Sequence, residues 1–160
     1  MAPLVLTKFD VAERQLLQAI RLFFAGGDPV SVHTVSEAAA QVLYDIRGFL
    51  GIENRLRDSD LIRSEYRREW LATLGRSRNF FKHADRDPSD VHEFKDEFNH
   101  FSLLDGVGMY GPAKGSWTPE TIVFLQMVRS NVSRTDSARP KVGGRDAATT
   151  SGVEKRTRCA

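Results

Sequence analysis

Three segments of the chain combine a helix-start signal with apolar residues at helical spacing. The start signals are Thr7 with Asp10 three residues later, Asp28 followed by Pro29, and Thr118 followed by Pro119 and Glu120. Ser, Thr and Asp side chains cap the free N–H groups of a helix's first turn, and proline fits the first helical position. A chain with three such starts is constrained toward helices rather than sheets.

The apolar residues that follow these signals recur every three or four positions. The first stripe contains Phe9, Ala12, Leu16, Ile20 and Phe23. The second contains Val32, Val35, Ala39, Val42, Ile46 and Leu50, and the last contains Ile122, Leu125 and Val128, with Phe124 and Met127 beside them. Because a helix turns once per 3.6 residues, each stripe lies on one face. We predict an all-α bundle of four or five helices, whose first two are antiparallel neighbours.

The middle of the chain predicts two further helices. One begins near Ser59 or Asp60 and continues, with or without a break at Gly75, until Asp87-Pro88, since the residue before proline avoids the helical region. The other follows the spacing of Phe94, Phe98, Phe101 and Leu104 and reaches Tyr110, before a loop of sequence GPAKGSW. Residues 89–97 either begin that helix or are extended. The residues expected in the core are Phe23, Val42, Ile46, Trp70, Phe81 and Leu125.

Charge and composition divide the 160 residues into two parts. The chain is 41% hydrophobic, and residues 1–131 are predicted to form the helical bundle domain. Residues 132–160 are predicted to be a disordered basic tail, because they contain almost no large apolar residue to offset the entropy of ordering. From Ser133 onward the chain has seven basic against three acidic residues, which allows a weak attraction to polyanions that salt would screen.

The same composition excludes several classes of protein. No apolar run approaches the roughly 18 residues of a membrane span, and the first residues lack a secretory leader pattern, so we expect a cytoplasmic protein without membrane contact. The single cysteine, Cys159, excludes a disulfide framework within the chain. The body before the tail has a net charge of −2, so overall charge gives no argument for nucleic-acid binding.

Two sequence patterns that suggest cofactors do not have the context those cofactors need. Residues 106–111, GVGMYG, match the dinucleotide-binding spacing, but they follow a helical pattern rather than a strand and precede Pro112. The four histidines, His33, His83, His92 and His100, lack the spacings that place two metal ligands on one helical face. We therefore predict no cofactor and no metal.

The segment Arg78-Asn79-Phe80-Phe81-Lys82-His83 carries one chemical pattern. An arginine followed by asparagine, with a histidine after four intervening residues, resembles the signature of the HEPN superfamily. Members of that superfamily are helical bundles, many of them metal-independent ribonucleases or inactive RNA-binding relatives. The superfamily also tolerates five intervening residues, and Arg86 and His92 have that spacing here. The segment NFFKHADRDP is also similar to one in small bacterial proteins of comparable length, a likeness that implies no particular activity.

The resemblance assigns candidate catalytic roles to Arg78, Asn79 and His83. His83 would accept the proton of an RNA 2′-hydroxyl, Arg78 would hold the negative charge on the phosphate, and Asn79 would orient either group. Arg78 and His83 lie about 140° apart on the outward face of one helix. A homodimer that pairs this face with its copy brings both residues of two chains together, and such an interface site is what the resemblance implies. The alternative is a solvated face on a non-catalytic helical interaction or structural module.

Overall fold

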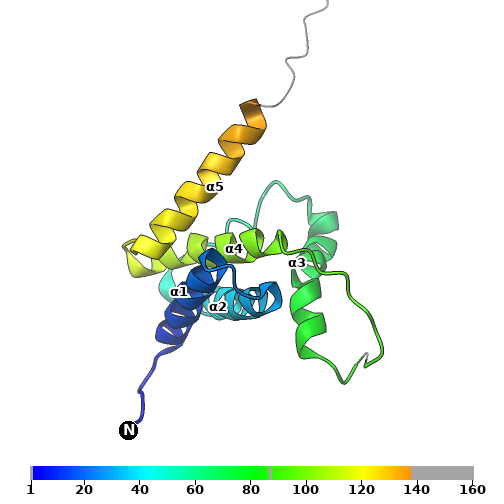
Figure 1. Ribbon diagram of the computed structural model, residues 1–160, viewed down its shortest axis with the longest axis horizontal. Coiled ribbons are helices and arrows are strands. Elements are labelled where there is room, and N and C mark those ends of the chain that lie inside the picture. The colour runs from blue at the N-terminus through cyan, green and yellow to red at the C-terminus, as the bar shows by residue number, and fades with distance from the viewer. Residues whose placement is uncertain (1, 87, 138–160) are drawn as a thin grey trace, which may run out of the picture.

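The computed structural model describes residues 2–86 and 88–137. These residues form α1 (Lys8–Phe24), α2 (Pro29–Leu50), α3 (Arg67–Lys82), α4 (Phe98–Lys114) and α5 (Pro119–Ser137), with a 3₁₀ turn, η1 (Ser64–Tyr66), before α3 (Figure 1). The described ranges contain these five α-helices and no strand. The prediction of an all-α bundle is confirmed.

Local hydrogen bonds begin the helices where the sequence predicts. The Thr7 hydroxyl accepts a hydrogen bond from the Asp10 backbone N–H at 3.1 Å, and the Asp10 carboxylate accepts one from the Thr7 N–H at 2.8 Å. The Asp28 carboxylate caps α2 by accepting from the Ser31 N–H at 2.8 Å. Gly51 ends α2 with a φ of 64°, a left-handed conformation that glycine adopts without strain.

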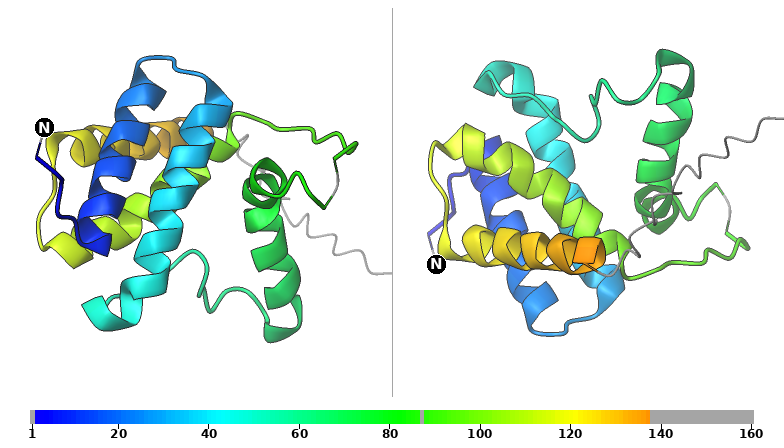
Figure 2. Two further views of the ribbon diagram at one scale, coloured as in Figure 1. Left: turned by 90° about the horizontal axis from the view of Figure 1, so that it is seen from below. Right: turned by 90° about the horizontal axis from the view of Figure 1, so that it is seen from above.

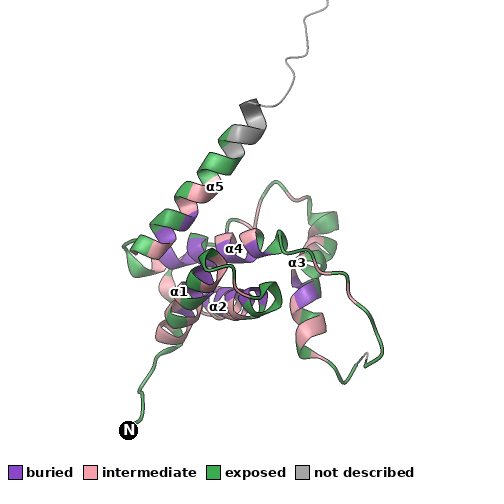
Figure 3. Ribbon diagram, viewed as in Figure 1, coloured by how far each residue is buried: buried purple, intermediate pink, exposed green. Residues whose placement is uncertain are grey.

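The core lies where α1, α2 and α4 pack together (Figure 3), and Phe124 of α5 is a buried member of it. Helices α1 and α2 run antiparallel across the short loop between them, as predicted (Figure 2). Small side chains in α2 let its neighbours approach closely, since Ala39 and Ala40 are fully buried. The other fully buried residues include Leu16, Ile20, Leu43, Leu103, Val107 and Tyr110.

The third helix stands to one side of this core. Its helical neighbour is α2, and irregular segments, 51–63 before it and 83–86 and 88–97 after it, lie between it and the neighbouring helices of the chain (Figure 2). The Trp70 indole N–H donates to the Leu56 carbonyl at 3.2 Å, and the rings of Phe81 and His33 meet edge to face. The contact between α3 and the core is therefore narrow, and it consists largely of aromatic and charged side chains.

Several predicted boundaries and burials differ from the structure. Helix α3 begins at Arg67 rather than near Ser59, and residues 89–97 are irregular, so α4 begins at Phe98. Helix α4 continues past Tyr110 to Lys114, with Pro112 inside it. Gly111 before this proline has no Cβ to clash with the proline ring, which makes the extension possible.

The six residues expected in the core are all only partly buried. They are Phe23, Val42, Ile46, Trp70, Phe81 and Leu125. In α5 the helical phase is also shifted, because Phe124 is fully buried whereas Ile122 is 43% exposed. The predicted tail, 132–160, lies mostly outside the described residues, and α5 extends into it as far as Ser137.

Candidate functional site

Arg78 of α3 points toward α2 rather than outward. Its Nη1 donates a hydrogen bond to the Gln41 Oε1 and lies 3.6 Å from the Glu37 Oε2. The prediction that Arg78 lies on the outward face of its helix is therefore wrong. Glu37 and Gln41 are four residues apart on α2, so both present polar atoms to the same point of α3. The sequence prediction oriented α3 by its apolar residues alone and missed these partners.

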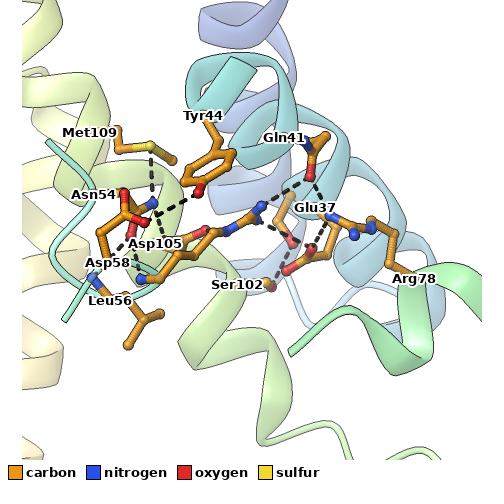
Figure 4. A network of polar contacts seen from close by, with 12 residues as sticks. Glu37, Gln41, Tyr44, Asn54, Leu56, Asp58, Arg78, Ser102, Asp105 and Met109 are labelled. Carbon is orange, nitrogen blue, oxygen red and sulfur yellow. Dashed lines mark hydrogen bonds and ion pairs between the residues drawn. The ribbon is translucent and has the colours of Figure 1, made fainter. Parts of the chain in front are cut away.

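A second arginine, Arg57, extends this contact into a buried polar network (Figure 4). The Arg57 guanidinium donates to the Asp105 Oδ2 at 2.8 Å and to the Gln41 Oε1 at 2.9 Å, and it lies 3.7 Å from the Glu37 Oε2. The Asn54 side chain joins the same group, donating to the Asp105 Oδ1 at 2.7 Å and accepting from the Arg57 backbone N–H at 2.6 Å. Residues from α2, α4 and the segment between α2 and α3 thus meet at one cluster.

The charges of this network balance within the protein interior. Burial raises the pKa of Glu37 and of Asp105, and the positive charge of Arg57 opposes the rise at both carboxyls. Two carboxylates face two guanidiniums, and the side chains of Arg57 and Asp105 are only 8% and 4% exposed. Because both arginines are already paired, we assign the network to holding α2, α3 and α4 together rather than to chemistry.

Asn79 and His83 line a different cavity, on the side of α3 that leads into residues 83–92. The cavity has a volume of about 320 Å³. Its lining residues are Ala72, Arg76, Asn79, Phe80, His83, Arg86, Asp90, Val91 and His92. The structure therefore brings two of the three predicted site residues together. Arg78 instead lines a separate cavity with Glu37, Gln41 and Tyr44.

His83 and Arg86 reach this cavity because α3 ends there. His83 is the C-terminal cap residue of α3, and its N–H donates to the Asn79 carbonyl at 3.1 Å. The Arg86 N–H then donates to the His83 carbonyl at 3.1 Å, so the chain turns back immediately after the helix. Both side chains thus remain near the last turn of α3, beside Asn79.

The cavity contains functional groups that sequence reasoning did not place there. Arg76, Arg86 and His92 join His83, giving two guanidiniums and two imidazoles around one open space. The signal for two of them was present, because Arg86 and His92 form another arginine–histidine pair at a spacing that the superfamily tolerates. Arginine binds phosphate oxygens and histidine exchanges protons near neutral pH, so this set suits proton transfer at a phosphate group.

The other patterns considered from the sequence are structural. The glycines of GVGMYG lie inside α4, where an added Cβ at Gly106 would come within 2.8 Å of Leu16 and one at Gly111 would clash with the Trp117 ring. Gly106 and Gly111 permit this close packing, whereas an added Cβ at Gly108 would meet nothing within 4 Å. His33 is buried, with Nδ1 at 3.2 Å from the Asn99 Oδ1. In residues 2–86 and 88–137, no group of three or more His, Cys, Asp or Glu is arranged to hold a metal ion.

No helix among the described residues is long and apolar enough to cross a membrane. No protein-family model, curated protein or solved structure matches the chain.

Proposed function

We propose that this chain binds RNA at the cavity of Asn79 and His83 and cleaves it without a metal. The observation that carries the proposal is the gathering of His83, Asn79, Arg76 and Arg86 around one cavity of about 320 Å³. The resemblance of residues 78–83 to the HEPN signature supports a role for Asn79 and His83 in this chemistry.

The reaction needs a base for the 2′-hydroxyl and positive charge at the phosphate. His83 takes the proton of the 2′-hydroxyl, and the 2′-oxygen attacks the adjacent phosphorus. The bond from phosphorus to the 5′-oxygen breaks, which leaves a 2′,3′-cyclic phosphate and a 5′-hydroxyl end. Arg76 and Arg86 hold the negative charge that develops on the phosphate oxygens, and Asn79 supplies a neutral hydrogen-bond donor beside them.

Arg78 has a different role in this proposal from the one its sequence position suggests. Its guanidinium is engaged by Glu37 and Gln41, so it positions α3, and with it Asn79 and His83, against α2. Arg76 and Arg86, which line the cavity, contact the phosphate instead. Arg78 is thus a positioning residue for the site.

The homodimer and the cytoplasmic location remain part of the proposal. A cavity with two arginines of its own provides phosphate contacts within one chain, so cleavage does not require a second copy. A dimer through the α3 face would instead extend the RNA-binding surface across two cavities. Sedimentation velocity of the wild type at micromolar concentration tests the dimer, and a monomer that still cleaves RNA shows that the site is complete in one chain.

The experiment incubates a labelled single-stranded RNA with the purified chain in excess EDTA. His83→Ala is compared with wild type and with His100→Ala, a control that removes a histidine of α4 outside the cavity. We expect His83→Ala to lower the cleavage rate by about 10²–10⁴-fold, the usual contribution of a general base. DNA of the same sequence should stay intact because it has no 2′-hydroxyl. Equal cleavage by wild type and His83→Ala contradicts the assignment.

A non-catalytic interaction module is the second candidate function. Phe98 and Phe101 of α4 are 43% and 51% exposed, and their rings lie 6.4 Å apart. Adjacent exposed aromatic side chains are typical of interaction surfaces. Absence of RNA cleavage by the folded wild type favours this function over the enzymatic one.

A further inference from the structure

His92 belongs to the segment that follows α3 and folds back onto that helix. Its Nε2 lies 2.9 Å from the Ser77 Oγ, a hydrogen-bond distance across 15 residues of sequence. Its ring packs against Phe80, with centroids 5.0 Å apart, and meets Phe81 edge to face at 6.1 Å. Three residues of one helix therefore fix the position of an imidazole that an irregular segment carries.

The same residue also lines the cavity that contains His83. His92 lines it together with His83, Arg76 and Arg86, and the side chain is only partly buried. The Ser77 hydroxyl can donate to a neutral ring nitrogen or accept from a protonated one, so it supports both protonation states of His92.

RNA transesterification has two proton transfers, and the proposed function uses only one histidine. The base takes the proton of the 2′-hydroxyl, but the departing 5′-oxygen is a poor leaving group unless it receives a proton as its bond to phosphorus breaks. A neutral imidazole can accept a proton and a protonated one can donate it, so two histidines at one site can act as base and acid. With His83 as the base, the second imidazole in the cavity is available for the leaving group.

We infer that His92 is the general acid of this site, held in place by Ser77, and that the substrate is an RNA phosphodiester with an alkoxide leaving group. The 2′-oxygen forms its bond to phosphorus as the bond from phosphorus to the 5′-oxygen breaks. The proton from the 2′-hydroxyl goes to His83, and the proton of His92 goes to the 5′-oxygen. This inference rests on the proposed function.

Two substrates with different leaving groups test the assignment. One is a dinucleotide, whose 5′-alkoxide needs a proton, and the other is a nucleoside 3′-(p-nitrophenyl phosphate), whose nitrophenolate leaves without one. We expect His92→Ala to slow cleavage of the dinucleotide by about 10²–10⁴-fold and to leave the nitrophenyl ester within a few-fold of wild type. His83→Ala should slow both substrates, because both need the 2′-oxygen to be deprotonated.

His92→Gln is the matched variant for a structural role, since its amide keeps a hydrogen-bonding group near Ser77. It should retain the wild-type melting temperature and show the same selective loss on the dinucleotide. The pH–rate profile of the dinucleotide should also lose its fall at high pH in both His92 variants, because that fall reports deprotonation of the acid.

The outcomes separate the inference from the proposed function. His92→Ala overturns the inference if it cleaves the dinucleotide at the wild-type rate, or if it slows both substrates equally. In either case the proposed function stands as long as His83→Ala slows both. Failure of the wild type to cleave either substrate overturns both proposals together.

Discussion

Replacing Arg57 by methionine removes the positive charge at the centre of the buried network while keeping an unbranched side chain as far as the position of the arginine Nε. The change deletes the hydrogen bonds to Asp105 and Gln41 and the 3.7 Å ion pair with Glu37. Asp105 then keeps only the Asn54 amide among the hydrogen-bonding partners of its carboxylate. A carboxylate that is 4% exposed is left without its counter-ion.

The expected loss is about 3–5 kcal/mol of unfolding free energy, the usual cost of removing one partner from a buried ion pair. A chain of this size loses about 2–4 °C of melting temperature per kcal/mol, so the midpoint should fall by about 6–20 °C. Arg55→Met is the control, because Arg55 lies exposed on the same segment. Its midpoint should stay within about 2 °C of wild type, since exposed substitutions usually change stability by less than about 0.5 kcal/mol.

The pH dependence of this loss identifies its cause. Burial already raises the pKa of Asp105 and of Glu37 above their ordinary values. Without Arg57 both pKa values should rise further, so the folded variant takes up protons at a higher pH than the unfolded chain does. Its stability deficit should therefore be largest at neutral pH and shrink as the pH falls toward 5.

Urea denaturation of both proteins at pH 7.5 and pH 5.5 measures this difference. The double variant Arg57→Met, Asp105→Leu should recover much of the loss, because apolar residues replace a buried ion pair at little cost. A midpoint for Arg57→Met equal to that of wild type refutes the reasoning, and so does a deficit that grows as the pH falls.

Three further predictions concern other parts of the molecule. Burial lowers the pKa of His33, so the stability that its neutral form provides should be lost as the pH falls below the unfolded-state pKa near 6.5. The urea midpoint of His33→Phe should therefore change less between pH 7.5 and pH 5.5 than that of wild type. An added Cβ at Gly108 meets nothing within 4 Å, so Gly108→Ala should raise the free energy of unfolding by about 0.5–1 kcal/mol. Gly111→Ala should lower the free energy of unfolding, because its Cβ clashes with Trp117. A higher melting temperature for Gly111→Ala than for wild type contradicts this packing. Arg86→Gln should weaken RNA binding and reduce the slope of log affinity against log salt by about one in filter-binding assays, whereas an unchanged slope means that Arg86 contacts no phosphate.

Local interactions made the ends of several helices predictable. The Thr7 cap, the Asp28 cap and the left-handed Gly51 each involve residues within five positions of one another. Such contacts form from neighbouring residues alone, so the sequence is sufficient to locate them. The apolar stripes of α1 and α2 were likewise readable because their period depends only on the geometry of one helix.

The orientation of α3 was decided by residues far from it in the sequence. Arg78 faces Glu37 and Gln41, which precede it by 41 and 37 positions. The pattern of residues within α3 gives no indication of these partners. A polar side chain on a helix turns inward when the neighbouring helix offers charged partners, and outward when it does not. The apolar pattern of α3 alone therefore predicted the wrong side for Arg78.

Some residues of the candidate site were predictable from the sequence, and others were placed only by the tertiary structure. The sequence alone indicated Asn79 and His83, because they stand in a recognisable local pattern on one helix. Only the tertiary structure placed His92 against Ser77 and opened the cavity that both histidines share. The position of His92 depends on aromatic and hydrogen-bonding contacts with α3, and no periodicity along the chain indicates where an irregular segment contacts a helix.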